Sequence, residues 1–522
     1  MSRATQTALI RDDRTLYEAV AGMAVGCSGV AFVTGLAALL DLLSIDDLVA
    51  GLELSVVFGV VLLGLGVSVV GFGLTSRLGY VETEAQPSAG LVASAAFTGI
   101  WVAVGLAISG VAGLPTAGQL GVGVILGAAA FATTALPRED IGSTLPAGAV
   151  AGFCGLLLVS GVVGPGLEQA LAGYNATLFG DTVVPAVVLL ASLVTGWSAA
   201  NAYGGFGARG RNIAAYVLIY LVVGSILAVL VGLVAFVTVK GLPGLFNGFG
   251  VGGAGLVRWP FLTNGAGLLA DTAGVFPALL GTVWLVIGAV LFAVPTGVGA
   301  AVFLSEYAEE GRFTGAVEVA TNGLWSTPSI VFGLFGAAFL IPRFGNQKSL
   351  IAGMLTLGFM LLPLVLITSR EAILAVPDEY RDASAALGVS KWQTIRSVVL
   401  PAAIPGVTTG VILGVGRIAG ETAPILLTMG GGVLPAKSAA PNVLGGFQLS
   451  ASPPFVSNPA LLEATSALPY QLYALITAGL SGNIQNPQEF AWGLALTLLG
   501  VVLAFYAIGI STRYYFRRKL HQ

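Results

Sequence analysis

The chain has 522 residues, of which 56% are hydrophobic and only 9% are charged, and its mean hydropathy is +0.93. Soluble domains carry about a quarter charged residues, so this composition indicates a polytopic membrane protein. The net charge of −3 gives no basic excess for binding nucleic acid, and the single histidine, His521, excludes histidine-based metal or acid–base chemistry. We therefore expect no metal, no cofactor and no catalytic residue.

Apolar stretches long enough to cross a bilayer as helices, about 20 residues each, recur along the whole chain. We predict twelve membrane spans, at 17–40, 52–74, 89–111, 118–136, 146–163, 182–203, 213–239, 276–304, 317–341, 350–369, 403–429 and 490–511. The expected fold is all-α.

Lysine and arginine fix the orientation, because cytoplasmic loops carry an excess of both. An even number of spans places both ends on one side. If that side is the cytoplasm, the inner segments hold most of the 22 basic residues, namely Arg3, Arg11, Arg14, Arg77, Arg138, Arg209, Arg211, Arg312, Arg370, Arg381, Lys391, Arg396, Arg513, Arg517, Arg518 and Lys519. An outer loop, DLLSIDD at 41–47, is acidic instead. We predict a cell-membrane protein with both termini in the cytoplasm.

A short, basic, glycine-rich stretch, GGFGARGRN at 204–212, separates two groups of six spans. Residues 1–207 would form one helical unit of unknown role and residues 208–522 another. The long inner loop of the second group, 370–402, has no counterpart in the first, so an internal repeat is not expected. The first group has little polar content and no buried charge pair is evident in it. The strongest candidates for function in this group are Asn201 and Tyr203, and we expect them to be interfacial anchors.

The inner loop at 370–402 predicts two short helices that meet at an elbow. DEYRDASAAL is compatible with a helix, Gly388 breaks it, and SKWQTIRSVVL begins a second helix with Ser390 as its N-cap. Pro401 is expected to end that helix before the next span.

Three apolar residues of the second helix, Trp392, Ile395 and Val399, recur at helical spacing. They predict either a knob that docks a soluble partner or an amphipathic helix that lies on the membrane surface. The spacing alone does not separate the two.

The loop resembles the coupling motif of ABC-importer permeases, in which an EAA triplet is followed by a glycine and by a hydrophobic–x–Leu–Pro ending. The triplet is Asp382–Ala383–Ser384 here, the glycine is Gly388, and the ending is Val398–Val399–Leu400–Pro401. Aspartate replaces glutamate and serine replaces the second alanine. Both departures keep size and polarity close.

Four further segments are similar to the A-type permeases (PstA) of phosphate ABC importers. They are 279–308, TPSIVFGLFG at 327–336, 376–428 and LPYQLYALI at 468–476, and the resemblance covers roughly 210–522. GETAP at 420–424 also favours the A type, since the C-type partner permease has GETMA there.

The resemblance implies a type I ABC-importer permease core in the C-terminal six helices. It also implies three partners: a C-type permease, a dimeric cytoplasmic ATP-binding subunit that docks on the coupling residues, and an extracellular phosphate-binding protein. Those coupling residues would be Asp382, Ala383, Ser384, Gly388, Leu400 and Pro401. The chain contains no G-x-x-x-x-G-K-[ST] phosphate loop, so we do not expect it to be the ATP-hydrolysing subunit or an enzyme.

A charged pair lies inside the eleventh predicted span, in GRIAGETAPILL at 416–427. Arg417 would lie about 21 Å along that helix, slightly past the bilayer centre, with Glu421 one turn later on the same face. Pro424 would free a carbonyl near that face. A guanidinium suits a tetrahedral oxyanion, and a competing carboxylate would keep the site weak enough to release it.

We place Arg417, Glu421 and the adjacent Thr422 on the predicted substrate path, as the family resemblance implies. The alternative is an internal salt bridge that only locks helix packing.

The function that these features favour is the permease subunit of an ATP-driven phosphate importer. A related alternative is a permease for another oxyanion, such as molybdate or sulfate. A secondary transporter would need several midplane acidic residues for ion coupling, and only Glu421 is convincingly placed for that. It would also have no need of the coupling loop.

Overall fold

The computed structural model describes residues 15–49, 51–170, 177–251, 257–266, 273–309, 311–452, 455–478, 484 and 486–520. Within these residues, eleven helices are long and apolar enough to cross a membrane, or up to twelve if one bent pair counts as a single span. The prediction of an all-α polytopic membrane protein is confirmed. Arg3, Arg11, Arg14 and His521 lie outside the described residues.

The chain divides into two compact units, residues 1–232 and 233–522. The predicted boundary near 207 coincides with the start of the long helix α8 (Gly207–Leu245), whereas the division between the units falls inside that helix.

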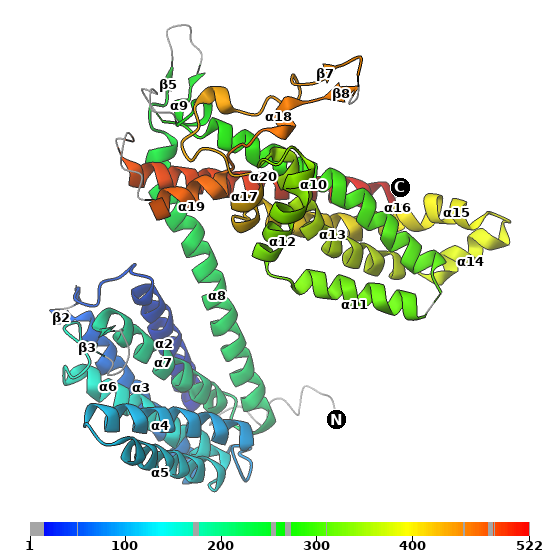
Figure 1. Cartoon of the computed structure of the whole chain (residues 1–522). Coiled ribbons are helices and arrows are strands. Elements are labelled where there is room, and N and C mark those ends of the chain that lie inside the picture. Colours follow the sequence, from blue (N-terminus) through cyan, green and yellow to red (C-terminus); the bar gives the residue numbers. More distant parts are fainter. Residues whose placement is uncertain are drawn as a thin grey trace. The chain divides into compact units, whose positions relative to one another are not determined.

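In its described residues, unit 1 holds a bundle of six helices in three antiparallel pairs, followed by the first part of α8 (Figure 1). α2 packs on α7, α3 on α6 and α4 on α5. The helices are α2 (Thr15–Leu39), α3 (Leu54–Arg77), α4 (Leu91–Val111), α5 (Thr116–Ala135), α6 (Glu139–Val159) and α7 (Gly180–Tyr203). Fully buried apolar side chains on α3, α6 and α7, including Leu62, Ala147 and Val188, form its core.

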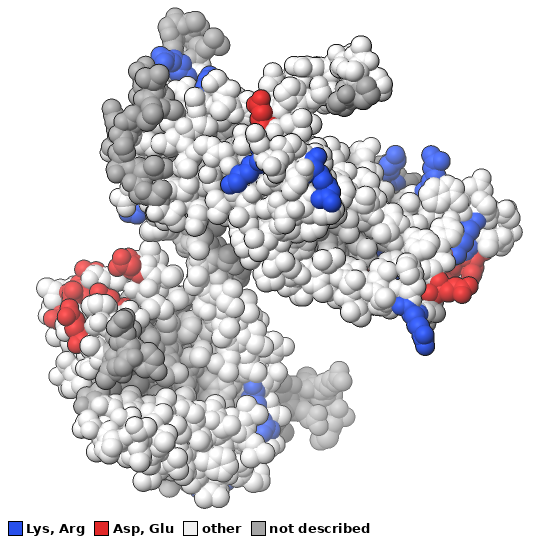
Figure 2. All heavy atoms as spheres, viewed as in Figure 1, with Lys and Arg blue, Asp and Glu red and all other residues white. Residues whose placement is uncertain are grey.

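Two short antiparallel hairpins cap one end of unit 1. β1 (Leu48–Val49) pairs with β2 (Leu52–Glu53), and β3 (Glu168–Ala170) pairs with β4 (Thr177–Phe179). Acidic side chains gather over this end (Figure 2). Among the residues of the two hairpins and the loop before β1, Asp46, Asp47, Glu53 and Glu168 are exposed. This is the end that the sequence assigns to the outer side.

Unit 2 is built around α10 (Phe276–Val302) and α13 (Leu350–Leu374), whose buried side chains, among them Leu285, Leu357 and Leu361, form the core. A five-residue π turn, η1 (Phe303–Tyr307), extends α10. The other helices are α9 (Pro260–Thr263), α11 (Arg312–Ser326), α12 (Ser329–Phe335), η2 (Gly336–Leu340), η3 (Ile341–Arg343), α14 (Asp378–Ala386), α15 (Lys391–Thr394), η4 (Ile395–Val399), α16 (Leu400–Ala419), α17 (Ala423–Thr428), η5 (Lys437–Ala439), α18 (Pro459–Leu462), α19 (Leu468–Ala478) and α20 (Pro487–Leu520). Two hairpins pair β5 (Gly250–Val251) with β6 (Val257–Arg258) and β7 (Gln448–Leu449) with β8 (Val456–Ser457).

The ninth predicted span, 317–341, is broken. α11 and the segment Ser329–Arg343 meet at an angle of 105°. Thr327 has extended dihedrals (φ −68°, ψ 133°), as expected for a residue before a proline, and Pro328 follows it.

The bent pair nevertheless has to bring the chain back across the membrane once. Met354 of α13 lies against Gly288 of α10, and Val365 lies against Gly297, so the two helices run in the same direction. The segment between them must therefore return to the starting side. We count it as one crossing, which gives the twelve spans that the sequence predicts.

α16 differs from its prediction at both ends. The helix continues through Pro401 because the π turn η4 precedes this residue. The Leu400 N–H donates to the Ile395 carbonyl, five residues back. The proline, which has no N–H to donate, follows directly after this bond. The helix ends at Ala419 rather than near 429, and α17 begins separately. The predictions that Pro401 ends the helix and that 403–429 is one helix are wrong.

Candidate functional site

Arg417 lies in the last turn of α16, beside a break in the helix that holds Gly420, Glu421 and Thr422. Its Nε atom is 3.9 Å from Oε1 of Glu421, and the two side chains are 36% and 17% exposed. The predicted pairing of these residues is confirmed. The distance exceeds that of a hydrogen bond, so the carboxylate attracts the guanidinium without bonding to it.

The guanidinium of Arg417 also stacks on an aromatic ring. Its central carbon is 4.4 Å from the ring centroid of Trp325, near the end of α11. Arginine favours this geometry because its planar cation is attracted to the ring face. Within the described residues, no hydrogen bond to this guanidinium is found. Its donors are therefore available to an anion.

The break changes how the predicted path residues are placed. Glu421 and Thr422 lie between α16 and α17 rather than on one continuous helix, and Thr422 is the N-cap of α17. Pro424 occupies the first turn of α17. A backbone N–H in that turn would have no partner within the helix, so the proline breaks no helical hydrogen bond there. The prediction that Pro424 frees a carbonyl inside a helix is therefore wrong.

The coupling loop forms the predicted elbow. α14 ends at Ala386, Gly388 takes a left-handed conformation (φ +73°), and α15 begins at Lys391. Gln393 closes the start of α15, because its Oε1 accepts from the N–H (3.2 Å) and the hydroxyl (3.0 Å) of the N-cap residue Ser390. The glycine break and the Ser390 cap are both confirmed.

A buried hydrogen bond closes the elbow. The Ser384 and Thr394 hydroxyl oxygens are 2.8 Å apart, one on each side of Gly388. Ser384 is the residue that replaces the second alanine of the triplet. An alanine could not make this bond, so this departure from the motif has a structural role.

The exposed surface of the elbow differs from the predicted knob. Trp392 is exposed, but Ile395 and Val399 are buried against α10 and α13, so they fix the elbow to the core. Asp382, Ala383 and Gly388 are also exposed, whereas Leu400 and Pro401 are partly buried. The apolar residues that face outward are Tyr380, Leu387 and Trp392.

Arg381 fixes the elbow to α10, a contact that the sequence did not reveal. Its guanidinium donates to Oε1 of Glu306 in η1 (2.9 Å) and to the carbonyls of Ile373 (3.1 Å) and Val376 (2.7 Å). Glu306 is nearly buried. The sequence shows Glu306 in SEYA and Arg381 in DEYRDAS. The two residues are 75 positions apart, so no local spacing pattern predicts their contact.

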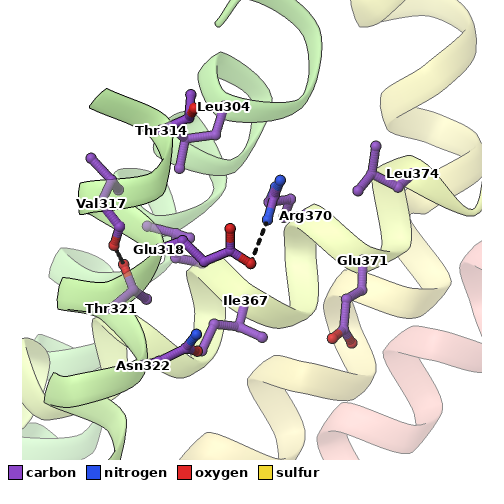
Figure 3. Close-up of a pocket in the computed structure, with 11 residues that line it drawn as sticks. Leu304, Thr314, Val317, Glu318, Thr321, Asn322, Ile367, Arg370, Glu371 and Leu374 are labelled. Carbon is purple, nitrogen blue, oxygen red and sulfur yellow. Dashed lines mark hydrogen bonds and ion pairs between the residues drawn. The ribbon is translucent and has the colours of Figure 1, made fainter. Parts of the chain in front are cut away.

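A second arginine–glutamate pair lies between α11 and α13. Arg370 Nη1 is 3.7 Å from Glu318 Oε1, beside a cavity of about 270 Å³ (Figure 3). Thr321, Asn322 and Glu371 also line this cavity.

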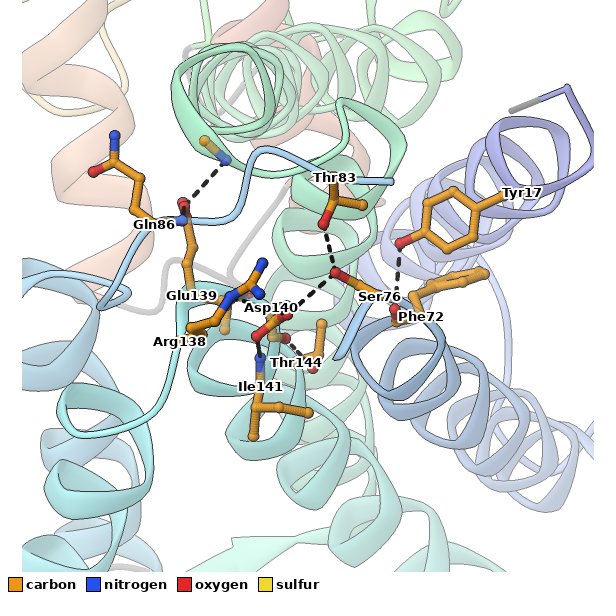
Figure 4. Close-up of polar contacts among 12 residues, drawn as sticks. Tyr17, Phe72, Ser76, Thr83, Gln86, Arg138, Glu139, Asp140, Ile141 and Thr144 are labelled. Carbon is orange, nitrogen blue, oxygen red and sulfur yellow. Dashed lines mark hydrogen bonds and ion pairs between the residues drawn. The ribbon is translucent and has the colours of Figure 1, made fainter. Parts of the chain in front are cut away.

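Unit 1 contains a buried acidic pair at the start of α6, which corrects the expectation of no buried charge pair there (Figure 4). Glu139 and Asp140 are 2% and 0% exposed. Glu139 Oε2 accepts from the backbone N–H groups of Gln86 (3.0 Å) and Gly207 (3.1 Å), and its other oxygen is 3.7 Å from Arg211.

Asp140 accepts a hydrogen bond from the Ser76 hydroxyl (3.2 Å) and lies 3.6 Å from Arg138. Asn201 is 1% exposed, so it is a core residue and not the interfacial anchor that we predicted. Tyr203 remains partly exposed.

The family model for the inner-membrane component of binding-protein-dependent transport systems matches residues 293–509. The chain is 35% identical over 199 residues to the probable ABC transporter permease protein YqgI of Bacillus subtilis, covering 38% of this chain and 68% of that protein. It is 34% identical over 252 residues to the phosphate transport system permease protein PstA of Mycobacterium leprae, covering 47% of this chain and 72% of that one. This chain belongs to the ABC-importer permease family.

The resemblance predicted from the sequence is thereby confirmed, and the chain is a multi-pass membrane protein of this family. The matched residues of this permease include the elbow, α11 and the Arg417 break, whereas unit 1 lies outside them. One solved structure, a chain of the MetNI methionine ABC transporter in an inward-facing conformation, is 18% identical with a TM-score of 0.33, over 47% of this chain and 94% of that one.

Proposed function

We propose that this permease is the A-type membrane subunit of an ATP-driven importer of inorganic phosphate. It would form the translocation path with a C-type permease, receive phosphate from an extracellular binding protein, and be driven by a dimeric cytoplasmic ATP-binding subunit. Both termini would be cytoplasmic, which agrees with the basic residues of the inner segments.

The observation that supports an oxyanion as the substrate is the state of the Arg417 guanidinium, and the phosphate permeases among the relatives favour phosphate within that class. It is held by a ring face and by a carboxylate 3.9 Å away, and neither uses its N–H donors in a hydrogen bond. A tetrahedral oxyanion can accept two or three of these bonds at once. Glu421 competes for the same cation, which would keep binding transient.

The elbow supports coupling to a separate motor. Its outer face presents Tyr380, Leu387 and Trp392, while Ile395 and Val399 anchor it to the core. Apolar side chains on a rigid projection suit insertion into a groove on a partner. A movement of that partner would reach α10 through Arg381 and Glu306.

The test is reconstitution of the four-component complex in liposomes. We expect phosphate uptake that requires ATP on the cytoplasmic side. Uptake driven by an ion gradient without ATP would instead identify a secondary transporter.

A second candidate is the import of another oxyanion, since a guanidinium accepts sulfate or molybdate as readily as phosphate. Competition decides between them. Excess unlabelled phosphate should abolish uptake of labelled phosphate, and equal concentrations of sulfate or molybdate should not.

A further inference from the structure

α11 contributes one neighbour to each of the two arginines. Trp325 stacks on Arg417, and Glu318 pairs with Arg370. These two α11 residues are seven positions apart, which is two helical turns on the same face, and Thr321 and Asn322 lie on that face between them. We call these four residues the α11 polar stripe.

The packing of α13 against α16 gives the direction of this stripe. Leu361 lies against Gly414, Thr368 against Gly410 and Ala372 against Gly406, so the two helices are antiparallel. Arg370 is therefore level with residues near 406–410 of α16. It lies about 10–16 Å nearer to the coupling elbow than Arg417, at 1.5 Å per residue.

The cavity beside Arg370 has room for a hydrated anion. Its volume of about 270 Å³ corresponds to roughly nine waters at their liquid volume. Arg370 and Asn322 both line it, and Figure 3 shows Arg370 directed toward Glu318 across the space between α11 and α13.

One donor beside this cavity is buried and has no hydrogen-bond partner within the described chain. Arg370 Nε is buried without a hydrogen-bond partner in the described part of the protein, and Glu318 is 3.7 Å away at Nη1. The exposed side chain of Asn322 also lines the cavity. A buried guanidinium donor left without a partner beside a cavity is suited to an acceptor that the chain does not supply.

We propose that Arg370 forms a second oxyanion site, on the cytoplasmic side of Arg417, and that the α11 polar stripe joins the two. This assignment rests on the proposed function and adds a step to it. Phosphate that leaves Arg417 passes along Thr321 and Asn322 and displaces Glu318 from Arg370 before it enters the cytoplasm. Glu318 and Glu371 keep the site weak, as an exit step requires.

The decisive experiment compares Arg370→Gln, the double variant Glu318→Gln with Arg370→Gln, and Arg312→Gln in the reconstituted complex. Arg312 is the matched control, an exposed arginine on another face of α11. We expect phosphate uptake per assembled complex to fall at least tenfold in the single and the double variant, with binding-protein-stimulated ATP hydrolysis retained. Arg312→Gln should stay within twofold of wild type.

The double variant separates an anion site from a salt bridge that only packs α11. Replacing both charges by neutral amides is expected to preserve a structural contact. If the double variant regains uptake to within twofold of wild type, the assignment is overturned. A wild-type complex that imports no phosphate would overturn the proposed function instead, and this assignment with it.

Thiol labelling gives a second readout that does not depend on transport. Asn322→Cys and Ala320→Cys, made with Cys27→Ser and Cys154→Ala, place one thiol on the stripe and one on the opposite side of α11. Phosphate added to inside-out vesicles should slow labelling at 322 and not at 320, and Arg370→Gln should remove this protection. If phosphate does not protect residue 322, the assignment is overturned.

Discussion

Arg417 combines two weak contacts where a structural arginine usually makes strong ones. Guanidinium groups held by a carboxylate form short, charge-assisted hydrogen bonds. Arg381 makes two such bonds in this chain, because its Nη2 and Nε both donate to Oε1 of Glu306, at 2.9 Å and 3.2 Å. Arg417 makes no such bond with Glu421. The sequence could predict the pairing from the four-residue spacing. Trp325 lies 92 positions earlier, so no local pattern could reveal its contact.

Conservative replacement of this arginine tests the role of its fork. Arg417→Lys keeps the charge but loses the planar donors and the stacking on Trp325. We expect phosphate uptake to fall at least tenfold in a complex that still assembles. Arg381→Lys is the contrasting variant, since it disturbs the elbow and should reduce binding of the ATP-binding subunit. The measurement is uptake normalised to assembled complex.

Exchange of the two charges tests the alternative of a packing salt bridge. Arg417→Glu with Glu421→Arg keeps a pair of opposite charges in the break after α16. We expect this variant to assemble and to transport no phosphate, because the guanidinium no longer stacks on Trp325. Full uptake by the exchanged pair would show that Arg417 is not a phosphate ligand.

The elbow is a rigid element whose shape depends on one backbone conformation. Gly388 has φ +73°, and a Cβ atom added there would meet no other atom within 4 Å, so any cost of substitution comes from the backbone alone. A β-branched residue in this conformation costs roughly 1–2 kcal/mol or more. We expect Gly388→Val to straighten the elbow and uncouple ATP hydrolysis from uptake.

A matched glycine provides the control for this prediction. Gly345, after η3, has φ +89° and equally open surroundings, but it lies far from the elbow in the sequence. Gly345→Val should strain its loop and leave coupling unchanged. Co-purification with the ATP-binding subunit and phosphate taken up per ATP hydrolysed are the measurements. Normal coupling in Gly388→Val would contradict the role of this glycine.

Local signals of the elbow were readable from the sequence, whereas its packing was not. Gly388 and Ser390 are marks of a helix end and a helix start, and both act within a few residues. Ile395 and Val399 share a face with Trp392 by spacing, but α10 and α13 cover two of the three. Pro401 shows the same limit, because the π turn that accommodates it depends on the tertiary setting.

The two units differ in how they use charge. In unit 2 the arginines at 370 and 417 keep unsatisfied donors beside cavities and breaks. In unit 1 the buried acids accept hydrogen bonds from within the unit: Glu139 joins the loop at Gln86 to the start of α8 at Gly207, and Asp140 accepts from the Ser76 hydroxyl. Such a network holds these elements together. The sequence could not distinguish Glu139 from a solvated loop acid, since the residues it bonds lie 53 and 68 positions away.

Neutralising this acid should therefore affect stability and not transport. Hydrogen bonds to a charged group are worth about 1.5–3 kcal/mol each, so Glu139→Gln should destabilise unit 1 by about 2 kcal/mol. Thiol-dye labelling during heating reports on this unit, because both cysteines lie in it and Cys154 is buried. Exposed Glu168→Gln is the control and should melt like wild type. Uptake per assembled complex should be unchanged, and its loss would argue for a functional role of this acid.

Removal of most of unit 1 tests whether the transport core is complete without it. The family match begins at residue 293, and the elbow, the Arg417 break and the Arg370 cavity are all formed by residues of unit 2. A chain beginning near Ala208 keeps the whole of α8 except its first residue, and with it the one crossing that precedes α10. It loses the contact of Glu139 with Gly207, so the start of α8 should fray without affecting residues beyond Leu233.

We expect this shortened chain to assemble with its partners and to retain measurable ATP-dependent phosphate uptake. Insertion and assembly are checked by co-purification with the ATP-binding subunit, and the same chain carrying Arg417→Gln gives the background. Uptake no higher than that background in a normally assembled complex would mean that unit 1 contributes to the substrate path.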